Sequence, residues 1–393
     1  MSHAKVALIM IKNRRIIYLL KNNPHPVGGT AVIYEHVKIL VDSGYDAYIS
    51  LQSVPGKDLY KSSAPILAHD GKFIWKSTDI IVFPETFPDL IHAFKNAPVR
   101  KIMFCQNQYN LPFFIGSQQD FFSEYLVDGL VISSEAIREF ITSLYGLTDI
   151  RYIPYSVDTK VFFSRDKKRQ IAYMPRKLPR DAIFLEAVFK RTYPQYAQIP
   201  WVKIHDLDRE AGASILGESE IFLSLSYQES FGLPPLEAMA SGCLIAGYHG
   251  DGGREYMNEQ NGWWADASDW RTCVEGLAQA LKLLDEGGEE LAKMHQAMAD
   301  TVAKYSQEKN ESSTTKILGR GNQKTYEIKL KCFRVFFTNS DGESCVVFNV
   351  SSGLLGASYG ESIPVKFLSS LARALAYRPF VSRCSQTSNG ASI

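Results

Sequence analysis

Short apolar runs alternate with segments of helical periodicity along the first 300 or so residues. Lys5–Ile11 and Asp46–Leu51 are two such runs, and each has the length and residue types of a buried strand. Between them, Ala31–Val41 repeats its apolar positions at helical spacing, and Gly44 follows as a C-cap glycine would. The pattern predicts a strand–loop–helix–strand unit, the building block of a parallel doubly wound sheet.

The same alternation of predicted strands and helices continues up to a polar, basic stretch at Ser164–Gln170, which is typical of a linker, and begins again after it. Before the linker, the further predicted strands are Asp79–Phe83, Lys101–Cys105, Gly129–Ser133 and Ile150–Pro154. After it, the predicted strands are Ile171–Met174, Trp201–His205, Ile221–Ser224 and Cys243–Gly247, with helices near Asp181–Arg191 and Trp270–Glu286.

This pattern predicts two α/β domains, residues 1–163 and residues 164–305. Ligands of such sheets bind beyond the carboxyl ends of the strands, so a cleft between the two halves is the expected site.

Residues 306–393 do not fit the α/β rhythm. The segment is Ser-rich and basic, Leu354–Ser370 is aperiodic, and no helix that could return to the first domain is apparent after Tyr305. Three interpretations remain open for this tail: a small appended domain, a disordered extension, or out-of-frame coding sequence.

Composition narrows the class of protein. The chain has 393 residues, a hydrophobic fraction of 45%, a charged fraction of 22% and a formal net charge of +1. The net charge gives no electrostatic case for nucleic acid as a partner. No apolar run is long enough to span a bilayer, and no secretory signal is expected. The six cysteines lack the spacing of metal ligands and suit reduced thiols in a cytoplasm. The protein is therefore expected in the cytoplasm, and contact of the protein with the inner face of a membrane remains an open alternative.

The most informative segment is 224–242, which reads SLSYQESFGLPPLEAMASG. It leaves an apolar strand, turns at Gly232 and enters a helix whose first turn contains Pro234 and Pro235, where proline is well tolerated. The backbone N–H groups of Phe231, Gly232 and Leu233 are expected to point outward at the positive end of the helix dipole. Such a turn is suited to binding a diphosphate.

Two carboxylates flank this turn, Glu229 before it and Glu237 one turn inside the helix. A carboxylate accepts two hydrogen bonds at once and so suits a vicinal diol, on a ribose or on a sugar ring. Taken singly, each glutamate also fits a structural role, as a helix cap or as a partner of the helix dipole. Together with the turn, the two acids predict a site for a nucleotide-diphosphate sugar.

The segment resembles the signature of retaining family-4 (group 1) glycosyltransferases, in which two glutamates are separated by seven residues. Gly252-Gly253-Arg254-Glu255 and Asn261-Gly262 are similar to motifs that follow in that family. Upstream, Ile153–Phe162 resembles its interdomain segment, with Tyr155-Ser156 in place of Asn-Gly. The resemblance covers roughly residues 5–300 and implies the GT-B fold, in which two Rossmann-like domains face each other. Residues 1–163 would then form the acceptor-side domain and residues 164–305 the nucleotide-sugar donor domain.

The resemblance also implies roles for individual residues. Glu237 would hold the nucleotide ribose, Glu229 would face the transferred sugar, and the amides of 231–233 would bind phosphate or sugar hydroxyls. Arg176 is the preferred cation for the diphosphate, with Lys177 or Arg180 as the second. Gly28 and Gly29 would let the donor approach the first domain closely.

One stretch departs from the family pattern. Many relatives carry a His or Asp near the reacting sugar, whereas the corresponding stretch here, Cys105–Asn110, offers amides. An amide positions a hydroxyl but is no general base at neutral pH. Arg176 and the helix terminus would then act mainly by stabilising charge on the departing diphosphate, with Glu229 beside the sugar and without a metal or another cofactor.

The sequence therefore predicts a retaining, metal-independent transferase that moves a hexose-type sugar from a nucleotide-diphosphate sugar to a glycan or lipid-linked acceptor. Two alternatives stay open: a nucleotide-sugar epimerase of related fold, and a catalytically silent protein that binds nucleotide sugars.

Overall fold

The computed structural model describes residues 14–22, 28–53, 60, 62–68, 73–86, 88–115, 121–125 and 127–319. The chain divides into two compact units, Met1–Asn322 and Gln323–Ile393, and the second lies outside the described residues. The predicted strand Lys5–Ile11 and most of the unassigned tail also lie outside them.

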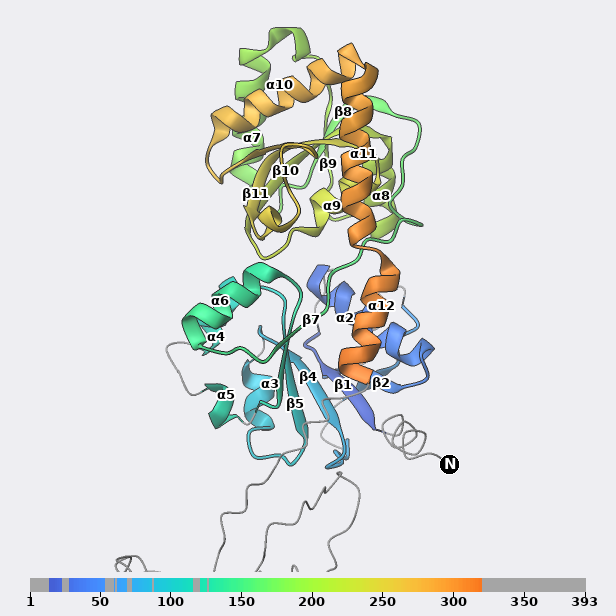
Figure 1. Cartoon of the computed structure of the whole chain (residues 1–393), viewed down its shortest axis with the longest axis vertical. Helices are drawn as coiled ribbons and strands as arrows, with labels where there is room; N and C mark the ends of the chain where they lie inside the picture. Colours follow the sequence, from blue (N-terminus) through green and yellow to red (C-terminus); the bar gives the residue numbers. More distant parts are fainter. Residues whose placement is uncertain are drawn as a thin grey trace, which may run out of the picture. The chain divides into compact units, whose positions relative to one another are not determined.

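The first lobe of the described unit is a seven-stranded parallel sheet with helices around it (Figure 1). Its strands are β1 (Arg15–Leu19), β2 (Asp46–Leu51), β3 (Ile66–Ala68), β4 (Ile80–Pro84), β5 (Arg100–Cys105), β6 (Gly129–Ile132) and β7 (Ile150–Tyr152). Its helices are α2 (Gly28–Asp42), α3 (Pro88–Ala93), η1 (Gln108–Asn110), α4 (Leu111–Ile115), α5 (Phe121–Glu124) and α6 (Glu135–Tyr145). The strand order is β3-β2-β1-β4-β5-β6-β7, which contains the doubly wound order 3-2-1-4-5-6.

The second lobe is a five-stranded parallel sheet in the order β12-β11-β10-β8-β9. Its strands are β8 (Lys168–Tyr173), β9 (Trp201–Lys203), β10 (Ser219–Glu229), β11 (Leu244–Asp251) and β12 (Trp263–Ala265). Its helices are α7 (Pro179–Thr192), η2 (Pro194–Tyr196), α8 (Arg209–Glu218), α9 (Leu233–Ala240), η3 (Gly252–Glu255), α10 (Trp270–Glu286) and α11 (Gly288–Lys304). Strand order reverses between β8 and β10, so the expected ligand position is beyond the carboxyl ends of these two strands.

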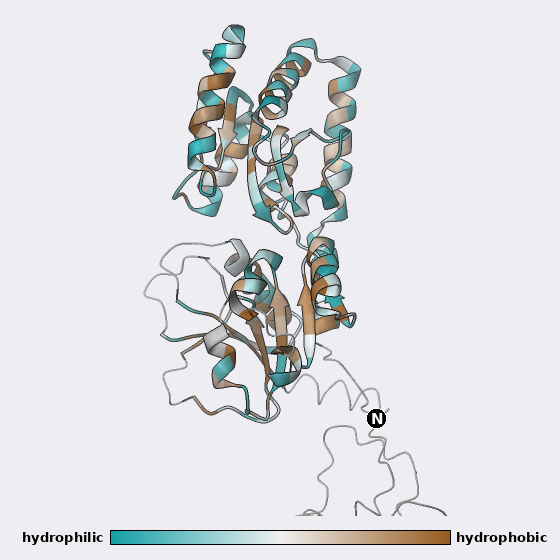
Figure 2. Cartoon of the chain, turned by 90° about the vertical axis from the view of Figure 1, so that its left-hand side faces the viewer, coloured by the Kyte–Doolittle hydropathy of each residue, from teal (hydrophilic) through white to brown (hydrophobic). Residues whose placement is uncertain are grey.

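The strands are buried because they are almost wholly apolar. Ile16–Leu19 of β1 and Ile221–Leu225 of β10 are at most 5% exposed, and this includes the polar Ser224. Figure 2 shows the strands as brown, hydrophobic segments, while teal positions gather on the outer faces of the helices. Continuous apolar runs of this kind are typical of strands covered on both faces.

A helix in the segment left unassigned by the sequence pattern returns to the first lobe. Helix α12 (Gln307–Thr314) is followed by a π-helical turn, Thr315–Gly319. The buried Asn310 donates through Nδ2 to the carbonyl of Pro154 at 2.6 Å, and α12 packs against α2. The expectation that no helix returns after Tyr305 is therefore wrong, because polar contacts rather than an apolar stripe hold this helix.

Candidate functional site

The turn between β10 and α9 lies at the carboxyl edge of the second sheet, beside the reversal in strand order. Glu229 is the last residue of β10, and Gly232 is the N-cap of α9 with φ of +86°, a conformation that glycine adopts without strain. No side chain caps α9, and no acidic residue lies in its first turn. The helix terminus therefore keeps its positive end available for an anion.

A lysine from the neighbouring strand reaches this turn. Lys177 follows β8, and its Nζ lies 2.7 Å from Glu229 Oε1 and donates to the carbonyl of Tyr227 at 3.0 Å. Arg176 is exposed and has no ion pair or hydrogen-bond partner among the residues that the structure describes. Lys177, rather than Arg180 on α7, therefore contacts Glu229, and no described residue pairs with the Arg176 guanidinium.

Glu237 lies one turn inside α9 and is half-buried. Both Glu229 and Glu237 act electrostatically on the Tyr256 hydroxyl, whose pKa is raised mainly by burial, and that hydroxyl donates to the carbonyl of Gly232. Both acids therefore lie near enough to this hydroxyl to influence it, and the hydroxyl itself binds the backbone of the turn.

The side chain of Phe231 has a structural place. It is 1% exposed, and its ring centroid lies 5.1 Å from that of Tyr155 and 4.9 Å from that of Tyr256. Any contact of Phe231 with a ligand is thus restricted to its backbone. The predicted roles of the Phe231, Gly232 and Leu233 amides stay predictions.

Burial alters the acidity of Glu237. It raises the pKa of this carboxyl to about 7, while the charge of Arg209 acts in the opposite direction. The folded state therefore holds the proton at pH values where the unfolded chain has released it. Stability linked to this proton is fully present below pH about 4.5 and declines until pH about 7.

Glu237→Gln is accordingly expected to gain stability relative to the natural protein as the pH rises from about 5 to about 8. The measurement is the melting temperature of both proteins, without ligand, across this range. Glu289→Gln on the exposed surface of α11 is the control and should keep a constant difference. A constant difference for Glu237→Gln as well would contradict the raised pKa.

Loops of the first lobe contact the β10–α9 turn directly. Asn107 Nδ2 donates to the carbonyl of Gln228 at 3.2 Å, and the backbone N–H of Gln108 donates to Ser230 Oγ at 3.1 Å. Tyr109 donates to the carboxylate of Asp251. The Cys105–Asn110 stretch, which the sequence placed near the reacting sugar, therefore touches the predicted donor turn.

The two glycines at the start of α2 lie close to the same stretch. Gln106 Nε2 donates to the carbonyl of Gly29 at 3.1 Å, and a Cβ on Gly29 would lie 3.1 Å from Gln106 Oε1. A Cβ on Gly28 would meet no atom of the described residues within 4 Å. Their predicted contact with a donor remains a prediction.

Sequence reasoning missed Glu85, which follows β4 at the strand-order reversal of the first sheet. It is 4% exposed, accepts from the Gln106 N–H at 3.1 Å and from Asn110 Nδ2 at 3.0 Å, and burial raises its pKa. The available signal was an acid placed immediately after a wholly apolar strand.

No group of three or more His, Cys, Asp or Glu side chains within the described ranges is arranged to hold a metal ion. An Asp-x-Asp string occurs at Asp206-Leu207-Asp208, but Asp208 caps α8 by accepting from the N–H of Ala211 at 2.9 Å. None of the helices within the described part of the chain is long and apolar enough to cross a bilayer.

Comparisons with known proteins agree with this architecture. Residues 204–329 match the family model described as "Glycosyl transferases group 1". An α-1,6-glucosyltransferase from Actinobacillus pleuropneumoniae serotype 7 is 27% identical over 277 residues, which cover 67% of this chain and 83% of the relative.

Solved structures are similar in fold. A glycosyltransferase from Rickettsia africae is 15% identical, with a TM-score of 0.59 over 78% of this chain and 97% of the other. Anabaena HepE, solved in complex with UDP-glucose, is 11% identical, with a TM-score of 0.57 over 77% of this chain and 98% of the other. The predicted fold, two Rossmann-like lobes of GT-B type, is confirmed. The matched segment, the curated relative and the fold together make the chain similar to the group 1 glycosyl transferases.

Proposed function

We propose that this protein is a retaining, metal-independent hexosyltransferase that uses a nucleotide-diphosphate sugar and a glycan or lipid-linked acceptor. The observation that carries the proposal is the turn at Gly232, with an uncapped helix N-terminus and with Lys177 and Glu229 in contact; the exposed Arg176, next to Lys177 in the chain, has no partner among the described residues. An uncapped helix terminus next to two cations suits a diphosphate.

UDP-glucose is the first donor to test. The curated relative is named as a glucosyltransferase, and the structure of Anabaena HepE holds UDP-glucose. Glu237 would bind the ribose diol and Glu229 the transferred hexose. The buried free cysteines Cys105, Cys243 and Cys273 support a reducing compartment, and we place the protein in the cytoplasm. Whether the protein contacts a membrane face depends on whether its acceptor is lipid-linked.

In this proposal the chain acts mainly on the departing diphosphate. Arg176 and Lys177 would stabilise its developing negative charge together with the amides of the turn, and the diphosphate itself would accept the acceptor's proton. Glu229 would leave its pairing with Lys177 to accept sugar hydroxyls as Lys177 turns to phosphate. The loop at Asn107 and Gln108 would orient the donor sugar through amide hydrogen bonds.

The decisive experiment combines binding with product analysis. UDP, GDP and ADP and their glucose conjugates are screened by thermal shift, because a ligand of the native state raises the melting temperature. The best donor is then incubated with glycan acceptors, and the anomeric configuration of the product is read by NMR. Retention of configuration is expected. An epimerised nucleotide sugar formed without acceptor, or binding without donor hydrolysis or transfer, would replace the proposal with one of its two alternatives.

Arg176→Ala is expected to weaken UDP binding about tenfold, the usual cost of losing one charge-assisted hydrogen bond. Its melting temperature should not change, because Arg176 is exposed and unpaired within the described residues. Affinity for uridine, which lacks phosphate, should also stay the same. Isothermal titration calorimetry measures the two affinities, and a thermal melt gives the melting temperature.

Arg180→Ala is the matched control, since Arg180 is also exposed but lies within α7. Equal losses of UDP affinity in the two variants would mean that the cations act only through general electrostatic attraction and that Arg176 makes no specific contact.

A further inference from the structure

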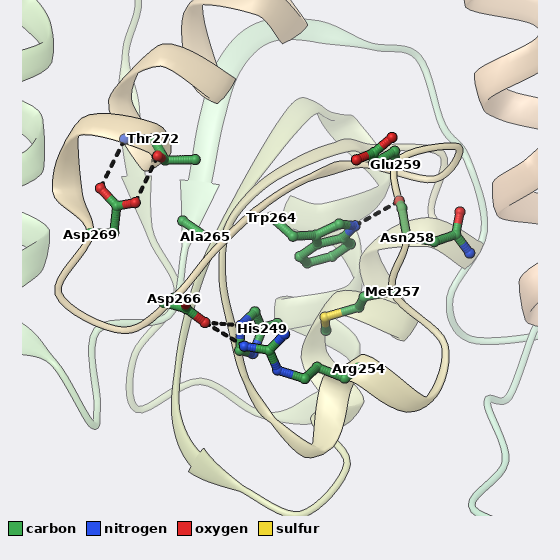
Figure 3. Close-up of a pocket in the computed structure, with 10 residues that line it drawn as sticks. All are labelled: His249, Arg254, Met257, Asn258, Glu259, Trp264, Ala265, Asp266, Asp269 and Thr272. Atoms are coloured by element: carbon green, nitrogen blue, oxygen red, sulfur yellow. Dashed lines mark hydrogen bonds and ion pairs between the residues drawn. The ribbon is translucent and has the colours of Figure 1, made fainter.

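A pocket of about 300 Å³ lies at the carboxyl ends of β11 and β12, outside the residues assigned to the donor. Figure 3 shows its lining side chains, with the indole of Trp264 in the middle of the group. The lining residues are His249, Arg254, Met257, Asn258, Glu259, Trp264, Ala265, Asp266, Asp269 and Thr272.

The pocket adjoins the predicted donor turn. Glu229 at the end of β10 is in register with Asp251 at the end of β11, immediately before η3. Met257 forms part of the wall, and a Cβ placed on Gly232 would lie 4.0 Å from its Cε. The pocket therefore lies close to the turn at Gly232.

Trp264 is held in one orientation. Its Nε1 donates to the carbonyl of Asn258 at 3.0 Å and to Asn261 Oδ1 at 3.2 Å, so the edge of the indole is fixed. The side chain is half-buried and leaves ring surface on the pocket. A rigid aromatic surface with a satisfied polar edge suits the apolar C–H face of a sugar ring.

Acceptor oxygens are available beside the indole. Asp266 Oδ1 is engaged by His249 Nε2 at 2.7 Å and by Arg254, whereas Oδ2 has no partner among the described residues, and the side chain is 72% exposed. By contrast, both oxygens of Asp269 are used to cap α10 through Thr272. Asp266 Oδ2 is thus an oriented acceptor for a hydroxyl group.

The charge of the pocket selects among ligands. Its lining contains three carboxylates, Glu259, Asp266 and Asp269, against the single guanidinium of Arg254. A phosphate or diphosphate group would be repelled by this excess of negative charge, whereas a neutral hydroxyl-rich ring would find acceptors. The volume is sufficient for a small ligand.

We propose that this pocket is a subsite for a neutral sugar unit of the acceptor glycan, which stacks on Trp264 and donates a hydroxyl hydrogen bond to Asp266. The assignment rests on the proposed glycosyltransferase function. It predicts that the acceptor is recognised partly by the second lobe, next to the bound donor.

The test uses the full chain labelled with 5-fluorotryptophan. Its five tryptophans give separate ¹⁹F signals, and Trp264→Phe assigns one of them. Maltose and isomaltose at millimolar concentration are the probes, with and without UDP. The Trp264 signal is expected to shift with a saturable dependence on disaccharide, while that of Trp201 on β9 stays constant. Asp266→Ala should weaken the disaccharide affinity about tenfold.

Glu289→Ala is the matched control, because Glu289 is also an exposed carboxylate in an ion pair, with Lys293 at 2.9 Å. Binding of UDP in the same samples reports separately on the donor site. If UDP binds but neither disaccharide shifts the Trp264 signal, the subsite is wrong and the proposed function stands. A shift that Asp266→Ala and Glu289→Ala affect equally also overturns the subsite. Failure of UDP to bind, with the Trp264 shift intact, counts instead against the proposed function.

Discussion

Glu229→Ala is expected to reduce turnover by about 10²- to 10³-fold, the range seen when one group that stabilises a transition state is removed. Affinity for UDP should change little, because in the proposed complex Glu229 contacts the sugar and not the nucleotide. Lys177 would lose its carboxylate partner but would keep its hydrogen bonds to the carbonyls of Tyr227 and Gln228. The measurement is kcat for transfer together with the dissociation constant of UDP.

Glu220→Ala is the matched control on the same strand. Glu220 lies at the opposite end of β10, is similarly exposed and pairs with Arg169 at 3.3 Å, so its loss removes an equivalent ion pair far from the turn. Glu237→Ala completes the set and should weaken UDP binding. Negligible effects of both Glu229→Ala and Glu237→Ala on UDP binding and on turnover would remove the turn from the mechanism.

Much of the fold could be predicted because parallel strands buried on both faces are marked in the sequence by short apolar runs. The predicted strand Asp46–Leu51 has the same bounds in the structure, and Trp270–Glu286 is helical over its whole predicted length. Strand β1, Arg15–Leu19, is another short apolar run that the prediction did not include, whereas the predicted strand Lys5–Ile11 lies outside the described residues and stays a prediction. Two neighbouring apolar runs of similar composition cannot be told apart as strands of the sheet unless the strands that pair with them are known.

Elements that are held by polar contacts, or that contain very few residues, were not predicted. Helix α12 (QEKNESST) has no apolar stripe, and its packing depends on Asn310 and on Thr314, both buried. Strands β3 and β12, with three residues each, were not predicted either. Such elements are stabilised by tertiary partners that a local pattern does not contain.

The candidate site divides in the same way. The turn at Gly232 could be predicted because its strand, glycine, prolines and helix are contiguous. The choice of Lys177 over Arg180 as the neighbour of Glu229 could not, because it depends on how the loop after β8 folds toward the end of β10. The same holds for Glu85 and for the contact between Gln108 and Ser230, which join residues distant in sequence.

A second large effect is expected at Gly252, where the backbone of η3 lies against the donor turn. A Cβ at this position would lie 1.9 Å from the carbonyl carbon of Ser230 and 2.5 Å from the backbone N of Phe231. Because these obstacles are backbone atoms, no side-chain rotation can relieve the clash. Gly252→Ala should therefore displace the turn, lower the free energy of unfolding by about 3 kcal/mol and abolish UDP binding.

Gly212→Ala separates this effect from a general intolerance of alanine. Gly212 is also buried, but its Cβ would lie 3.5 Å from Ile204 Cγ2, an ordinary contact, and alanine favours the helical backbone of α8. Urea denaturation of both variants gives the two free energies, and the Gly212→Ala value should equal or exceed that of the natural protein. If Gly252→Ala were as stable as Gly212→Ala and still bound UDP, the position of the donor turn could not depend on close packing against the backbone of η3. The loss of binding in Gly252→Ala, without any change to Glu229, Lys177 or Glu237, would instead show that the site depends on the position of the backbone as much as on its charged side chains.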